Sequence, residues 1–134
     1  MKTPNEDLPK QDIKKRILRT ATRLFARHGF RGTSLQSIVD QIGIRKPSLL
    51  YHYPSKEALR NAVLDDLIVH WQQRLPAVMN AATSGRDRLD AILGEVTTFF
   101  AEDPNRARLI WREAIDRPGE TRERWSRDFG TWLI

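Results

Sequence analysis

Residues 44–59, with the sequence IRKPSLLYHYPSKEAL, concentrate side chains that can bind a polyanion. Lysine can donate to a guanine edge or a phosphate, serine can donate to either, and proline can lie against a thymine methyl group. Tyrosine and histidine suit phosphate oxygens, which fix the register of a protein on DNA rather than its sequence preference. The residue types of this segment are therefore those of a nucleic-acid contact, and the elements that position them decide whether they work together.

The positive charge of the chain is concentrated in its first half. The 134 residues carry a net charge of +6 at pH 7. Residues 1–60 hold 13 Lys and Arg against 5 Asp and Glu, a net charge of +8, whereas residues 61–134 hold 10 Arg, no Lys and 12 acids, a net charge of −2. This asymmetry favours a polyanion-binding module joined to a more neutral one. The alternative is that the basic helices are simply solvated surfaces.

The composition predicts a soluble cytoplasmic protein that is not an enzyme. Its 40% hydrophobic residues suffice for a core, and the absence of cysteine excludes disulfides and thiol chemistry. The N-terminus lacks the apolar run of a signal peptide, and no apolar stretch approaches the ~20 residues of a membrane span. The sequence contains no H-E-x-x-H, no G-x-S-x-G and no phosphate-binding glycine loop, and its three histidines are scattered. We therefore expect no catalytic residues, no metal site and no cofactor.

The spacing of apolar residues predicts an all-α fold of seven helices. Gly29 and Gly43 stand where a glycine ends a helix. Thr33 and Gln36 have the spacing of a capping box at the start of the second helix. Pro76 is expected to weaken or bend the long fourth helix. The expected helices cover residues 12–28, 33–42, 46–53, 55–75, 89–100 and 105–116, with a last one around Trp125.

The second and third of these helices have the layout of a helix-turn-helix motif. Helix 33–42 is followed by a glycine-containing turn and by the short, polar helix 46–53. In this motif the first helix braces the second, which enters the DNA major groove by its N-terminal end. Leu49 and Tyr53 have the spacing of core residues that face back toward the bracing helix.

The segment from Ile17 to Leu59 resembles the DNA-binding domain of the tetracycline-repressor (TetR) family of bacterial regulators. The likeness rests on Ala21, on the pairs LF and GF, and on GTS followed by SLLYHYPSKEAL, in the order and spacing of the family. Helix-turn-helix spacing alone is a weak signal, but the last string joined to GTS is a strong one. The resemblance implies a transcriptional regulator, most often a ligand-responsive repressor, that binds an operator in double-stranded DNA as a homodimer.

The resemblance also implies which residues contact DNA. Base reading falls on the start of the recognition helix, backbone contacts on its end and on the next helix, and further contacts on the bracing helix. Arg45 stands where the family often has a serine cap and adds a cation near DNA, and Leu50 stands where it often has a tyrosine. A solvated helix start for Lys56 and an inert surface role for His52 remain alternatives. The positions are Lys46, Pro47 and Ser48 for bases, Tyr51, His52 and Lys56 for the backbone, and Thr33, Ser34 and Gln36 on the bracing helix.

We expect a DNA-binding domain over residues 1–54 and a helical regulatory domain over residues 55–134. The resemblance implies that the second domain binds a small effector and dimerises. Its rings could line an apolar pocket, although ordinary core residues are the alternative. The candidates are Trp71, Phe99, Phe100 and Trp111.

The sequence ends on the apolar string FGTWLI. The resemblance implies dimerisation through a C-terminal helix pair, for which we expect no counterpart in these residues. Apolar side chains at such an end need a cover, so we expect either a C-terminally truncated regulatory domain or an end that is buried against a partner. The alternative function is a helical interaction module, or a truncated regulator that no longer binds DNA specifically.

Overall fold

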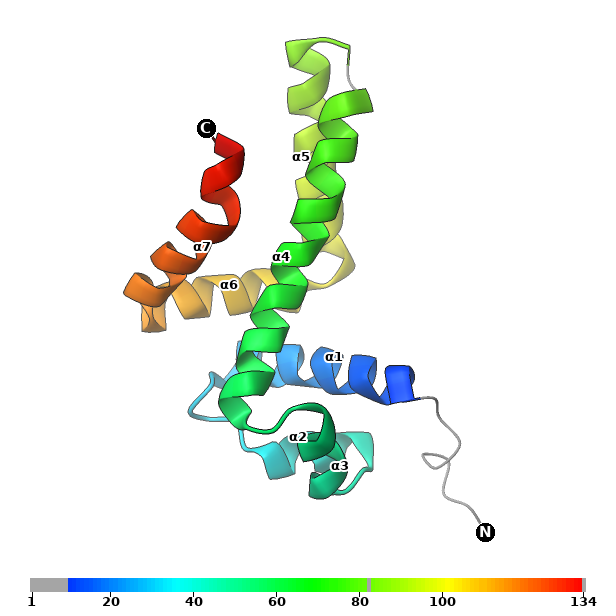
Figure 1. The fold of residues 1–134 in the computed structure, drawn as a ribbon, viewed down its shortest axis with the longest axis vertical. Coiled ribbons are helices and arrows are strands. Elements are labelled where there is room, and N and C mark those ends of the chain that lie inside the picture. The colour runs from blue at the N-terminus through cyan, green and yellow to red at the C-terminus, as the bar shows by residue number, and fades with distance from the viewer. Residues whose placement is uncertain (1–9, 82, 134) are drawn as a thin grey trace. The chain divides into compact units, whose positions relative to one another are not determined.

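The structure is a computed structural model that describes residues 10–81 and 83–133, with side chains over residues 12–81 and 83–128. The described residues form seven α-helices and no strand, as the apolar spacing predicted. None of these helices is both long and apolar enough to cross a membrane. The helices are α1 (Lys10–His28), α2 (Leu35–Ile42), α3 (Lys46–His52), α4 (Lys56–Ala81), α5 (Gly85–Glu102), α6 (Pro104–Asp116) and α7 (Pro118–Leu133) (Figure 1).

The chain divides into two compact units, and the division lies inside α4. Unit 1 is Met1–Asp65 and unit 2 is Asp66–Ile134. Unit 1 contains α1, α2, α3 and the first turns of α4, so all the predicted DNA contacts lie within it. Unit 2 contains the rest of α4 and the three helices that follow.

Unit 1 has an apolar core to which each of its helices contributes. The contributing residues repeat at helical spacing, which places them on one face of each helix. Leu49 and Tyr53, expected in the core, are 0% and 5% exposed, and that expectation is confirmed. The other buried apolar residues of this unit are Ile17, Ala21, Leu24, Phe25, Ala26, Ile38, Val39, Ile42, Leu59 and Val63.

The start of α2 differs from the predicted capping box. Ser34, not Thr33, is the N-cap, and its hydroxyl accepts a hydrogen bond from the Ser37 amide at 3.0 Å. Gln36 does not bond back to the helix start; its amide donates to the Asp40 carboxylate at 2.8 Å. Thr33 is 2% exposed, and its Oγ1 lies 2.8 Å from the carbonyl oxygen of Gly29 and 3.1 Å from that of Leu24. The prediction was wrong because the Thr33 hydroxyl bonds backward to α1 and its turn.

Thr33→Val is expected to lower the free energy of unfolding of unit 1 by about 1 kcal/mol, because the substitution removes a buried donor while it keeps the side-chain shape. Urea unfolding followed by circular dichroism measures this change. Thr22→Val is the matched control, since the buried Thr22 hydroxyl bonds to Leu18 within α1 and ties no turn to a helix. Equal effects of the two substitutions would show that Thr33 does not stabilise the turn.

Pro76 does not end α4, which continues to Ala81. A proline lacks only its own N–H, so the amides after it can still bond to carbonyls one turn back. In unit 2, Ser84 caps α5 by accepting from the Asp87 amide at 3.1 Å. Asp103 caps α6 by accepting a hydrogen bond from the Asn105 amide at 3.0 Å. Pro104 occupies the first turn of α6, where a backbone N–H would have no intrahelical partner.

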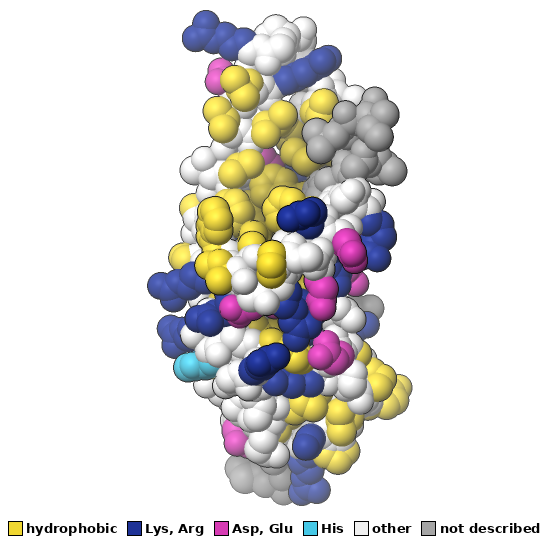
Figure 2. Space-filling view, turned by 90° about the vertical axis from the view of Figure 1, so that its left-hand side faces the viewer, with side chains coloured by type: hydrophobic (Ala, Val, Ile, Leu, Met, Phe, Trp, Pro, Cys, Tyr) yellow, Lys and Arg dark blue, Asp and Glu magenta, His cyan; other side chains and the backbone are white. Residues whose placement is uncertain are grey.

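Hydrophobic side chains gather on one face of unit 2, in the upper part of Figure 2. Several large apolar residues of this unit are exposed, among them Leu89 and Leu93 on α5 and Trp111 and Ile115 on α6. Each pair is four residues apart and so lies on one face of its helix. The expectation of a covered or truncated C-terminal end concerns FGTWLI, whose side chains lie outside those the structure describes.

Candidate nucleic-acid interface

A left-handed glycine makes the turn between α2 and α3. Gly43 has φ 80° and ψ 31°, a conformation that glycine adopts without the steric cost of a Cβ atom. The Gly43 and Ile44 amides both donate to the carbonyl oxygen of Val39, at 2.8 and 3.2 Å. This closes the end of α2 and sends the chain into α3 within three residues.

The start of α3 is exposed and positively charged. Arg45 is the N-cap in an extended conformation and makes no side-chain capping bond, which agrees with the expected loss of the serine cap at this position. Arg45, Lys46 and Pro47 are exposed, and Ser48 is half-buried. Pro47 lies in the first turn, where its missing N–H has no intrahelical partner to lose. The residues predicted to read bases are therefore open to a ligand.

One buried side chain anchors α3 to the unit. The structure describes every residue of α3, and among them only Leu49 is buried, with 0% exposure. Tyr53 at the C-cap is also buried, and its amide donates to the Leu49 carbonyl at 2.9 Å. A helix of seven residues is too short to be stable alone, so its position depends on these contacts.

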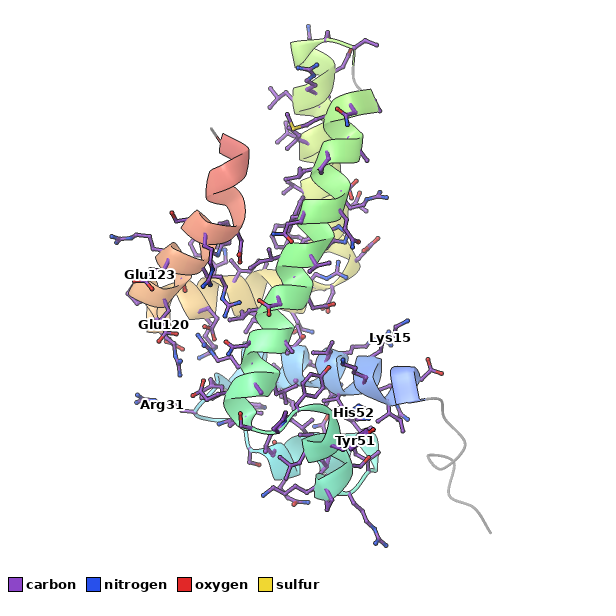
Figure 3. All side chains as sticks on the ribbon, in the orientation of Figure 1. Lys15, Arg31, Tyr51, His52, Glu120 and Glu123 are labelled. Atoms are coloured by element: carbon purple, nitrogen blue, oxygen red, sulfur yellow. The ribbon has the colours of Figure 1, made fainter. Side chains whose placement is uncertain are left out.

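The last turn of α3 carries the two ring residues predicted to contact the DNA backbone. Tyr51 is 70% exposed, and its ring lies edge-on to the His52 ring with 5.1 Å between the centroids. Figure 3 shows both side chains at this end of α3. An exposed phenol beside a half-buried imidazole offers two groups that can bond to phosphate oxygens.

The three predicted contacts on the bracing helix are placed differently from one another. Ser34 and Gln36 are exposed, although the Ser34 hydroxyl already accepts from Ser37 and the Gln36 amide already donates to Asp40. Thr33 is buried and bonds to α1 and its turn. A DNA contact by Thr33 stays a prediction, and its burial favours a structural role.

Lys56, predicted to contact the DNA backbone, lies against an aromatic ring. Its ammonium nitrogen is 4.2 Å from the centre of the Phe30 ring, which comes from the turn between α1 and α2. Partial burial lowers the pKa of Lys56 below its usual value, and the nearby Glu57 carboxylate opposes that shift. Lys56 is thus not a fully solvated helix start.

Two contacts in this region have no local signal in the sequence. The first is the Lys56 ammonium on the ring of Phe30, for which the sequence predicted no role. The second is made by Lys14 of α1, whose ammonium nitrogen lies 5.8 Å from the centre of the Tyr53 ring. In both cases the partners are far apart along the chain, and apolar spacing says nothing about cations that pack on rings. Lys14 therefore joins the basic groups near the end of α3.

Not all the cations of α1 face the same way. Arg16 donates to the carbonyl oxygen of Ile42 at 3.3 Å, and so satisfies a carbonyl at the end of α2. The Arg23 guanidinium donates to the side chain of Gln41. Figure 3 shows Lys15 pointing away from α2 and α3. The basic composition of α1 therefore includes structural and solvated residues as well as neighbours of the interface.

Comparison with known proteins identifies the region that contains this interface. A sequence model of the bacterial regulatory proteins of the tetR family matches residues 17–63. The chain is also similar to the HTH-type transcriptional regulator LmrA of Bacillus subtilis (strain 168), with 34% identity over 91 residues, which are 67% of this chain and 48% of LmrA. This chain therefore carries a tetR-family domain.

The tetR-family domain has relatives in other species as well. The HTH-type transcriptional regulator RutR of Escherichia coli (strain K12) is 45% identical over 64 residues, which are 48% of this chain and 30% of RutR. The chain thus spans half or less of the length of these two relatives. The structure of the ketosteroid transcriptional regulator KstR2 of Mycobacterium tuberculosis matches 88% of this chain with a TM-score of 0.68 at 21% identity, a likeness of fold.

Beyond the tetR-family domain, three of the four predicted effector-binding rings lie together. Trp71 of α4 lies 4.7 Å from Phe99 and 6.4 Å from Phe100, measured between ring centroids. Phe99 is 2% exposed and holds the Arg106 guanidinium 4.4 Å from its ring centre. Trp111 on α6 is 70% exposed. Phe99 is therefore a core residue between α4 and α5, with the half-buried rings of Trp71 and Phe100 beside it, and an effector contact by any of the four rings stays a prediction.

An ion pair between Arg74 and Glu95 borders these rings, with His70 beside it. The Arg74 guanidinium donates to both oxygens of the Glu95 carboxylate, at 2.8 and 3.3 Å, and lowers the pKa of Glu95. His70 lies with its Nε2 3.6 Å from the same carboxylate and its ring 4.5 Å from that of Phe99. The pair of α4 and α5 is thus held by both apolar and charged contacts.

Proposed function

We propose that the protein is a transcriptional regulator that binds double-stranded DNA sequence-specifically through α3. The exposed start of α3 carries this proposal, because Lys46 and Pro47 are open to the outside while the buried Leu49 anchors the helix to the unit. This arrangement suits the entry of a recognition helix into the major groove by its N-terminal end. The membership of residues 17–63 in the tetR family supports it.

The proposed contacts divide into two kinds. Lys46, Pro47 and Ser48 read base edges, and Arg45 adds a cation beside them. Tyr51, His52 and Lys56 bind the sugar-phosphate backbone and fix the register, helped by Ser34 and Gln36 of the bracing helix.

The proposed mode of action is that of a ligand-responsive repressor. Two copies of unit 1 would bind half-sites one helical turn apart, and a small apolar or amphipathic effector in unit 2 would favour a different separation of the two recognition helices. Relatives named as regulators, and one named as the repressor KstR2 of Mycolicibacterium smegmatis, support this reading. Dimerisation and effector binding are both part of the proposal.

Selection of binding sites from a library of random duplexes tests the proposal. A regulator of this kind should enrich one inverted repeat whose half-site centres are about 10 base pairs apart, or a multiple of that. Enrichment of no common sequence after several rounds would show that the protein does not recognise DNA specifically.

The alternative is a helical interaction module without specific DNA binding, and the exposed apolar face of unit 2 favours it as the second candidate. The mass of the protein in solution separates the two readings. A dimer supports the regulator, because one copy of unit 1 would bind a single half-site only weakly. A monomer would favour the interaction module.

Lys56→Ala is expected to weaken binding to all duplexes alike, because a phosphate contact carries no sequence information. The slope of log K against log salt should fall in magnitude by about 1, the value for the loss of one phosphate contact. Binding titrations at four salt concentrations with selected and random duplexes measure both effects. Lys15→Ala is the matched control, since Lys15 points away from α2 and α3 (Figure 3). An unchanged slope in Lys56→Ala would remove Lys56 from the backbone contacts.

A further inference from the structure

The turn between α1 and α2 is held rigidly on both sides of Phe30. Gly29 has φ 77°, which ends α1 in the left-handed conformation. A Cβ atom on Gly32 would lie 2.2 Å from the carbonyl oxygen of His28, so only glycine fits there without a backbone shift. Thr33 then bonds back to Gly29 and Leu24. Phe30 is therefore presented by a turn with a defined conformation.

The Phe30 ring has a core neighbour and two cationic neighbours. Its centroid lies 5.7 Å from that of the buried Phe25 ring. The Lys56 ammonium nitrogen lies 4.2 Å from the ring centre, and the central carbon of the Arg60 guanidinium lies 5.8 Å from it. The negative face of an aromatic ring attracts cations within about 6 Å. Lys56 and Arg60 are one helical turn apart, so both cations can lie against the same ring.

This contact restrains a side chain that would otherwise be flexible. The lysine side chain is a flexible four-carbon stem, and an unrestrained lysine loses much of its conformational freedom when it binds a phosphate. Lys56 begins α4, and the turn that holds its ammonium leads directly into Ser34, the N-cap of the bracing helix α2. The ammonium is thus fixed beside the turn that enters α2, before any DNA is bound.

We propose that Phe30 is a positioning residue for DNA binding, which holds the Lys56 ammonium in place for a backbone phosphate; the inference rests on the proposed function. Phe30 itself is not proposed to contact DNA. Its contribution is to reduce the freedom that Lys56 loses on binding, which is the general benefit of preorganisation.

A double-substitution cycle on DNA affinity tests this role. Phe30→Leu should weaken binding to selected and random duplexes alike, by about two- to fivefold, the range expected for an exposed cation–ring contact. In the Lys56→Met background the same Phe30 substitution should have no further effect, because there is no ammonium left to position. Phe30→Tyr is the matched control: it keeps the ring face and should bind like the original protein.

Each other result of the cycle has a definite meaning. If Phe30→Leu weakens binding equally in both backgrounds, the residue acts only through the stability of the turn. If it strengthens binding, the ring withholds Lys56 from DNA, and that result also overturns the proposal. Thermal unfolding of every variant shows whether the fold is kept.

The contact can also be measured without DNA. The ε-methylene protons of Lys56 should show an upfield ring-current shift in the NMR spectrum, retained in Phe30→Tyr and lost in Phe30→Leu. If the shift is present but the protein binds no DNA, the proposed function fails and the positioning role fails with it. If the protein binds DNA normally and the cycle is additive, only the positioning role is wrong.

Discussion

Leu49→Ala is expected to destabilise unit 1 by about 3 kcal/mol and to abolish specific DNA binding. Truncation of a fully buried leucine loses its transfer free energy and leaves a cavity, at a cost of about 2–5 kcal/mol. Leu49 is 0% exposed and is the single buried residue of the described helix α3. A seven-residue helix that loses its anchor no longer holds its polar side chains in one place. Urea unfolding and a binding titration measure the two effects.

Leu50→Ala is the matched control for this experiment. It makes the same chemical change at the next position of α3, where the side chain is half-buried. We expect the free energy of unfolding to fall by less than about 1.5 kcal/mol, because a half-buried leucine removes less apolar surface from water on folding than a fully buried one. Equal losses for Leu49 and Leu50 would contradict the orientation of α3 described above.

Lys46→Ala is expected to weaken binding to the selected duplex by about 10- to 100-fold and to change binding to random duplexes far less. A well-placed base contact contributes about 1–3 kcal/mol of discrimination, whereas a backbone contact contributes to all sequences equally. Lys46 is exposed at the first position of α3, where a recognition helix meets base edges. Titrations of both duplexes at one salt concentration measure the ratio of the two affinities.

Lys56→Ala serves as the comparison for Lys46→Ala. The proposed roles predict that Lys46→Ala lowers the ratio of specific to nonspecific affinity and that Lys56→Ala leaves it unchanged. If the two variants behaved identically on both duplexes, the division between base reading and backbone contact would be wrong.

The helices and most of the core could be predicted from the sequence because both follow from periodic spacing. Apolar residues that repeat every three or four positions define one face of a helix, and that rule placed Leu49 and Tyr53 in the core correctly. Glycine at a left-handed position is an equally local signal, and it marked the turn at Gly43. These features depend on residues that are close together along the chain.

The wrong or missing predictions concern the partners that polar, charged and aromatic side chains find in the folded chain. The capping box failed because the Thr33 hydroxyl bonds to the carbonyl oxygens of Leu24 in α1 and of Gly29 in the turn that follows, a choice of partner that the capping-box spacing does not reveal. The ammonium of Lys56 on the Phe30 ring could not be predicted because the two residues are far apart along the chain. The sequence does not distinguish Trp111, whose side chain is 70% exposed, from Phe99, which lies in the core. Tertiary contacts decide whether such a side chain is buried or exposed and which partner it binds.

Specific DNA binding by this chain can be tested in a single titration experiment. The protein is titrated, over a range of salt concentrations, against the DNA upstream of its own gene and against a random duplex of equal length. We expect the upstream DNA to bind at least about 1,000-fold more tightly at physiological salt, as specific sites typically do. Equal affinity for the two duplexes, with the same slope of log K against log salt, would mean that only the charge of unit 1 attracts DNA and that α3 does not recognise a specific sequence.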